Sequence, residues 1–137
     1  MSSPKRRSES AGLPEPTEAE LEVLRVLWQT GATTVRQVHE TLARTNPVAY
    51  TTVLTTLQIM HQKGLVKRDE SERAHVYAAA LSQRQAQKRF LGKILQRLFE
   101  GSSTELIMQA LGAGKPASAE ELAMIRARLK ELEGRQK

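Results

Sequence analysis

Hydroxyl groups concentrate in one short stretch of this sequence. Within the first two turns of a predicted helix lie Tyr50, Thr51, Thr52, Thr55 and Thr56. Threonine is a mediocre helix former, so this cluster indicates a role other than helix formation. Threonine hydroxyls reach phosphates or base edges, and the threonine methyl group can contact thymine, so an outward-facing cluster could read duplex DNA. Alternatively, these residues only favour the beginning of a helix.

The helix expected to carry these hydroxyls runs from about Ala49 to Lys63. Its apolar residues recur at helical spacing, so one side should pack while the hydroxyl-bearing side faces outward. Gly64 stands where a left-handed C-cap belongs. The residues of the packed side are Val53, Leu54, Leu57 and Met60.

Two helices are expected before this one and a hairpin after it. Thr17 with Glu20, and Thr34 with Gln37, have the spacing of helix N-terminal capping motifs. Two β-prone runs, 65–68 and 75–78, are joined by a polar loop, as in a hairpin. Three helices followed by a hairpin is the winged-helix order, in which the third helix enters the major groove. The predicted fold is mainly α with a small β-hairpin: a winged helix-turn-helix domain at 16–81, followed by a helical region.

The helical region, 82–137, carries apolar stripes that the winged-helix unit does not need for its own core. We expect these stripes to pack on a second subunit and to form a dimerisation region. The alternative is that they fold back on the same chain. The expected dimerisation residues are Phe90, Leu91, Ile94, Leu98, Leu106, Leu122, Ile125, Leu129 and Leu132.

Positive charge is spread beyond the hairpin. The 137-residue chain has a formal net charge of +6 and a pI near 10.0, which suits a polyanionic partner. Residues 1–15 are predicted to be a disordered basic tail, either simply solvated or an arm that touches nucleic-acid backbone. The same two alternatives hold for the basic helix expected at 82–100.

Composition narrows the function classes. The chain has no cysteine, which excludes disulfides and thiolate metal sites, and its three histidines, expected as isolated surface residues, lie in separate predicted elements. Neither a nucleophile motif nor a glycine-rich phosphate loop occurs, so we expect no enzyme, no metal and no cofactor. No apolar run is long enough to span a membrane, and a cytoplasmic protein without membrane insertion is expected.

An ordered set of motifs, TEAELEVLRVLW, AYTTVLTTL, KGLV and RAHVY, resembles the penicillinase-repressor family of bacterial transcriptional regulators, the BlaI and MecI group. The resemblance implies a homodimeric winged-helix repressor on a palindromic operator of double-stranded DNA. It places base contacts on Tyr50, Thr51, Thr52 and Thr55. It places phosphate or minor-groove contacts on the hairpin residues Lys67, Arg68, Arg73 and His75.

The resemblance also has limits. Ile59 stands where many members have arginine, and Glu72 stands where a glycine is frequent. In β-lactam-responsive members a transmembrane sensor protease system leads to repressor cleavage, and the matching position lies near Gln109 and Ala110. The cysteine-rich metal site of copper-responsive members is excluded here. The rival interpretation is a winged-helix protein-interaction module that does not read DNA.

Overall fold

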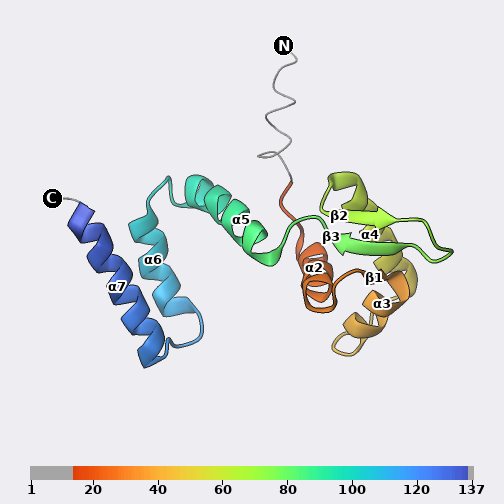
Figure 1. The fold of residues 1–137 in the computed structure, drawn as a ribbon, viewed down its shortest axis with the longest axis horizontal. Helices are drawn as coiled ribbons and strands as arrows, with labels where there is room; N and C mark the ends of the chain where they lie inside the picture. The colour runs from red at the N-terminus through yellow and green to blue at the C-terminus, as the bar shows by residue number, and fades with distance from the viewer. Residues whose placement is uncertain (1–13, 136–137) are drawn as a thin grey trace, which may run out of the picture. The chain divides into compact units, whose positions relative to one another are not determined.

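The structure, a computed structural model, describes residues 14–135 of the chain. This part forms six helices and three strands in the order α2, β1, α3, α4, β2, β3, α5, α6 and α7 (Figure 1). It divides into two compact units, one ending at Leu91 and the other beginning at Gly92. Nearly all of the expected basic tail, 1–15, lies outside the described residues. The functional boundary expected after Leu81 stays a prediction.

Helix α2 (Glu18–Thr30) begins at the predicted capping box. The Thr17 hydroxyl accepts a hydrogen bond from the Glu20 backbone N–H at 3.2 Å, and the Glu20 carboxylate accepts one from the Thr17 N–H at 3.0 Å. The helix ends at Gly31, whose φ of 83° lies in the region that favours glycine. Both ends of α2 are therefore fixed by local sequence, as predicted.

Helices α3 (Val35–Ala43) and α4 (Tyr50–Lys63) also begin and end close to the predicted residues. The Thr34 hydroxyl caps α3 by accepting a hydrogen bond from the Gln37 N–H at 3.2 Å. Helix α4 has Ala49 at its N-cap, and alanine has no side-chain acceptor, so the threonines that follow do not cap the helix. Gly64 ends α4 in the left-handed conformation, with φ of 85°, which confirms the predicted stop.

The predicted hairpin is formed by β2 (Val66–Asp69) and β3 (Val76–Ala79). A further strand, β1 (Thr33–Thr34), pairs with β3, which gives an antiparallel sheet in the order β1-β3-β2. The sequence did not predict β1. Two residues are too few to show an alternating pattern, and β1 exists only because β3 supplies its hydrogen bonds.

One hydrophobic core joins the helices to the sheet in the unit that ends at Leu91. Fully buried Tyr77 of β3, at 1% exposure, belongs to it together with apolar side chains from α2, α3 and α4. Burial of this kind is the main stabilising term in a small domain. The buried residues are Val23, Leu24, Val26, Leu27, Val35, Val38, Val53, Leu57, Met60, Leu65, Val66 and Tyr77.

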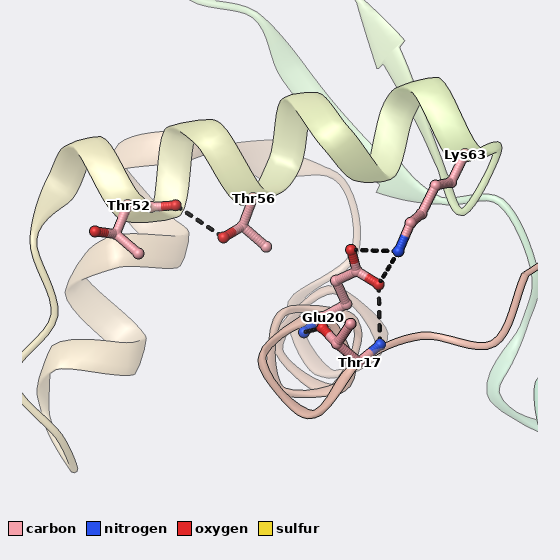
Figure 2. A network of polar contacts seen from close by, with 5 residues as sticks. All are labelled: Thr17, Glu20, Thr52, Thr56 and Lys63. Carbon is pink, nitrogen blue, oxygen red and sulfur yellow. Dashed lines mark hydrogen bonds and ion pairs between the residues drawn. The ribbon is translucent and has the colours of Figure 1, made fainter.

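A buried ion pair links the beginning of α2 to the end of α4 (Figure 2). Glu20 is only 4% exposed, and both of its carboxylate oxygens accept hydrogen bonds from Lys63 Nζ at 2.9 Å. The same carboxylate completes the capping box with Thr17. Glu20 therefore fixes the helix start and the packing of α2 on α4 at the same time.

The beginning of α5 (Gln83–Leu98) packs on the same core. The Trp28 indole Nε1–H donates a hydrogen bond to the Leu81 carbonyl at 2.9 Å, just before this helix. Ala86 is buried, and Phe90 packs against the core cluster. Phe90 therefore contacts its own chain, as in the alternative of back-folding, and its expected place at a dimer interface stays a prediction.

The unit beginning at Gly92 leaves its apolar side chains exposed. Helices α6 (Ser103–Ala113) and α7 (Ala119–Arg135) contain no buried residue, and among the expected dimerisation residues here only Leu106 and Ile125 are half-buried. Large apolar side chains exposed in such number favour an interaction site in this unit. The large exposed apolar residues are Ile94, Leu98, Ile107, Met108, Leu111, Leu122, Met124, Leu129 and Leu132.

Replacing Glu20 by Gln should lower the free energy of unfolding by about 1–3 kcal/mol, because Gln keeps the cap but leaves the partly buried Lys63 ammonium without its counter-charge. Urea unfolding followed by Trp28 fluorescence measures this. The matched control is Glu40→Gln, which removes the exposed Arg36–Glu40 pair and should cost less than about 0.5 kcal/mol. Equal losses in the two variants would contradict the account.

Candidate nucleic-acid interface

Helix α4 has one packed side and one exposed side. Val53, Leu57 and Met60 are buried in the core, as predicted from their spacing. Thr51 and Thr55 are exposed on the opposite side. Their hydroxyls and methyl groups can hydrogen-bond and pack against a ligand that lies along this side of α4. We call Thr51 and Thr55 the threonine face.

The other two threonines point elsewhere. The Thr56 hydroxyl donates to the Thr52 backbone carbonyl at 2.8 Å, and Figure 2 shows Thr56 on the side of α4 that faces α2. Thr52 and Thr56 also line a small hollow against α2, next to Glu22. The predicted hydroxyl cluster therefore separates into an outward pair and a flanking pair. Thr52 is exposed and stays a predicted contact at the edge of the threonine face.

Tyr50, 45% exposed, is held by a residue that sequence reasoning missed. The His39 and Tyr50 rings meet edge to face, with centroids 5.7 Å apart and an interplanar angle of 78°. His39 Nε2–H donates to the Val48 carbonyl at 2.8 Å. His39 was expected to be an isolated surface histidine, and this is wrong: it ties α3 to the loop that precedes α4.

The hairpin presents the predicted basic residues with different exposures. Lys67, Arg73 and His75 are exposed, whereas the side chain of Arg68 is 25% exposed. The loop between the strands is shaped by Asp69, whose Oδ1 accepts a hydrogen bond from the Ser71 N–H at 2.9 Å. Hydrogen bonds from the Ser71 backbone and hydroxyl hold the pKa of Asp69 below its usual range.

Arg68 is held by two oxygen groups. A hydrogen bond with the buried Tyr77 hydroxyl, followed by the charge of Glu70, raises the pKa of the Arg68 guanidinium above its ordinary value. Arg68 Nε lies 2.6 Å from Glu70 Oε2. The guanidinium is therefore charged and fixed in direction.

A groove of about 590 Å³ separates the first half of α4 from the hairpin. It brings together four of the predicted site residues: Tyr50, Arg68, Arg73 and His75. The predicted Thr51, Thr52, Thr55 and Lys67 do not line it. The remaining lining residues are Thr34, Val35, Arg36, Leu54, Gln58, Ala74 and Tyr77.

Arg36, at the beginning of α3, is a groove residue that sequence reasoning missed. Its only salt bridge in the described part of the chain, with Glu40, is at 3.5 Å and solvent-exposed. A cation in the first turn of a helix opposes the helix dipole. That unfavourable placement was the signal in the sequence that could have marked Arg36 as a ligand-binding residue.

Comparison with known protein families decides the identity of the chain. The model of the penicillinase repressor family matches residues 16–131, which include both compact units. The chain belongs to the penicillinase repressor family. This confirms the resemblance drawn from the sequence motifs, and the winged-helix fold agrees with it.

Individual relatives of this penicillinase repressor family member match it over different lengths. The transcriptional regulator BlaI of Mycobacterium tuberculosis, from strains CDC 1551 and H37Rv, is 47% identical over 62 residues. That segment spans 44% of this chain and 45% of the length of the relative. The match therefore spans less than half of the length of these curated relatives.

Two solved structures are also similar. The monomeric form of Bacillus licheniformis BlaI in complex with the blaP half-operator is 27% identical, with a TM-score of 0.46, and the match covers 52% of this chain and 87% of that one. The complex structure of hsRosR-S4 is 16% identical, with a TM-score of 0.52, and the match covers 95% of this chain and 99% of that one. The second likeness shows a shared fold.

Within residues 14–135, no group of three or more histidine, aspartate or glutamate side chains is placed to hold a metal ion. The same residues form no helix that is both long and apolar enough to cross a membrane. The chemistry that the site does offer is hydrogen bonding from hydroxyls and attraction of anions by guanidinium groups.

Replacing His39 by Ala should loosen the start of α4. We expect a loss of about 0.5–1.5 kcal/mol in unfolding free energy, because one partly buried hydrogen bond and one ring contact disappear. Amide hydrogen exchange should speed up at Thr52 and Val53, whose N–H groups bond to Ala49. His61→Ala, in the last turn of the same helix, is the control. Unchanged exchange in His39→Ala would show that His39 does not hold this loop.

Proposed function

We propose that the chain is a homodimeric transcriptional repressor that binds a palindromic operator in double-stranded DNA. The observation that carries the proposal is the threonine face of α4 beside a groove that contains three arginines and a histidine. Membership of the penicillinase repressor family supports it, as does a relative described as a transcriptional regulator.

In this proposal Thr51 and Thr55 contact base edges in the major groove, with Tyr50 and Thr52 beside them. Arg68, Arg73 and His75 contact phosphates from the hairpin, together with Lys67. Such backbone contacts orient the protein, and the base contacts select the sequence. Arg36 adds a phosphate contact from the α3 side of the groove, and Ile59 of α4, which does not line the groove, offers none.

Dimerisation would use the apolar residues predicted for it in the second unit, among them Leu122, Leu129 and Leu132, all of which are exposed. A standard-size interface buries about 800 Å² on each partner. Two linked reading units gain effective concentration on a two-part operator, so occupancy depends on the dimer. Bound at a promoter, the dimer would exclude RNA polymerase.

Repression could then be relieved through the second unit, by a cytoplasmic protease step that a transmembrane sensor system starts. The expected cleavage position, Gln109 and Ala110, lies within α6 and is exposed. A protease needs an extended backbone, so α6 must open locally first. Because α6 buries no side chain within the described part of its own chain, contacts within that chain oppose this opening only weakly.

Replacing both Thr51 and Thr55 by Ala should reduce affinity for a selected operator at least about tenfold, because base contacts carry the selectivity. Weak binding to mixed-sequence DNA should stay unchanged. The matched control is Thr56→Ala, whose hydroxyl is already bonded to its own backbone. Fluorescence anisotropy with both DNAs gives the result, and circular dichroism checks folding. Operator affinity unchanged in the double variant would favour the protein-interaction module instead.

Replacing Leu122 and Leu129 by Asp should convert the dimer to a monomer and weaken full-operator binding by about 100-fold or more. Affinity for a single half-site should stay unchanged, since the first unit is untouched. Met124→Asp is the control, because Met124 is 71% exposed and lies off the Leu122–Leu129 stripe. Sedimentation and anisotropy are the measurements. A leucine variant that stays dimeric would refute this interface.

A further inference from the structure

In the hairpin, the Glu70 carboxylate lies beside Arg68, at the position where a DNA phosphate would contact this arginine. Glu70 Oε2 lies 2.6 Å from Arg68 Nε, and Arg68 lines the groove beside α4. The Glu70 side chain is 51% exposed, so it can swing into solvent without leaving a cavity. The Arg68 side chain is only 25% exposed and also interacts with the Tyr77 hydroxyl, so it has less room to move than Glu70.

The contact between Arg68 and Glu70 is close but incomplete. Arg68 Nε is buried and has no well-formed hydrogen bond within the described part of the chain. Glu70 therefore supplies counter-charge to Arg68 without giving Nε a well-formed hydrogen bond. Buried donors normally have an acceptor, so a donor left without one is a place where a ligand oxygen gains a bond.

The two neighbouring acidic residues behave differently. Asp69 has its Oδ1 bonded to the Ser71 N–H, which fixes it in the loop. Glu72 is exposed and forms no ion pair among residues 14–135. Of the three hairpin acids, Glu70 alone in the described structure neutralises a groove arginine.

We propose that Glu70 occupies, in the free protein, the position on Arg68 that a DNA phosphate takes in the complex, so that DNA binding displaces Glu70. This inference rests on the proposed function. Carboxylate and phosphate are both oxyanion acceptors for a guanidinium, so one replaces the other. Because the Glu70 contact must be broken first, the Arg68–phosphate contact contributes less to the free energy of DNA binding. This weakens binding to all DNA sequences alike. Glu70 thus limits non-specific binding and leaves selectivity to the threonine face.

The test uses the full-length protein and a mixed-sequence DNA duplex, because phosphate contacts do not depend on sequence. Glu70→Gln should bind this duplex about two- to fivefold more tightly at low salt. The slope of log affinity against log salt should become steeper by up to about 0.9. Glu72→Gln, with the same charge change in the same loop, should give a smaller gain.

The Arg68→Gln background decides whether Glu70 acts through Arg68. Glu70→Gln should give no more gain there than Glu72→Gln does. The inference is overturned if Glu70→Gln raises duplex affinity by the full amount in the Arg68→Gln background. It is also overturned if Glu70→Gln and Glu72→Gln raise duplex affinity equally in the wild-type background. In either case Glu70 would act only by repelling the DNA phosphates. Wild-type protein that binds no duplex at any salt contradicts the proposed function itself, so the two failures are distinguishable.

Discussion

The Glu20 carboxylate is the constraint on which the arrangement of the first unit depends. It caps α2 through Thr17 and accepts both hydrogen bonds from Lys63 at the far end of α4 (Figure 2). A buried carboxylate is stable only when it is paired and hydrogen-bonded. Sliding or rotating α2 against α4 would leave the Glu20 carboxylate without Lys63, at a cost in stability. The ion pair holds the end of α4 against α2, and burial of Val53, Leu57 and Met60 leaves Thr51 and Thr55 facing outward.

Much of this fold could be predicted because local rules govern its boundaries. The capping box at Thr17, the left-handed stop at Gly64 and the spacing of Val53, Leu57 and Met60 each act within a few residues of the chain. The hairpin followed from two short β-prone runs. The order of these elements was enough to predict the winged-helix fold.

The site was predicted less completely, because its geometry depends on residues far apart in sequence. The contact of His39 with Tyr50, the pairing of Glu20 with Lys63 and the position of Arg36 in the groove arise only once the helices have packed. Helical spacing alone placed Thr56 with the outward hydroxyls, whereas its hydroxyl bonds back to Thr52. The contact of Phe90 with the core likewise could not be predicted from its place in a helical apolar stripe.

Selectivity, affinity and switching fall on different parts of the chain in this account. In the proposed function the threonine face would select the sequence, the hairpin and groove cations would supply attraction that Glu70 moderates, and exposed apolar residues of the second unit would supply the dimer. Trp28 and Phe90 anchor the beginning of α5 to the first unit, so the chain leaves that unit from a fixed point. If the second unit forms the dimer, as proposed, a change there would alter operator occupancy without changing α4.

The most direct measurement is selection of bound duplexes from a random DNA pool by the full-length protein, followed by sequencing. The account predicts an enriched inverted repeat whose half-site centres lie about 10–10.5 base pairs apart or a multiple of that, because a two-fold symmetric dimer places two α4 helices in successive major grooves. A pool with no enriched sequence, or with a single unrepeated element, would contradict it.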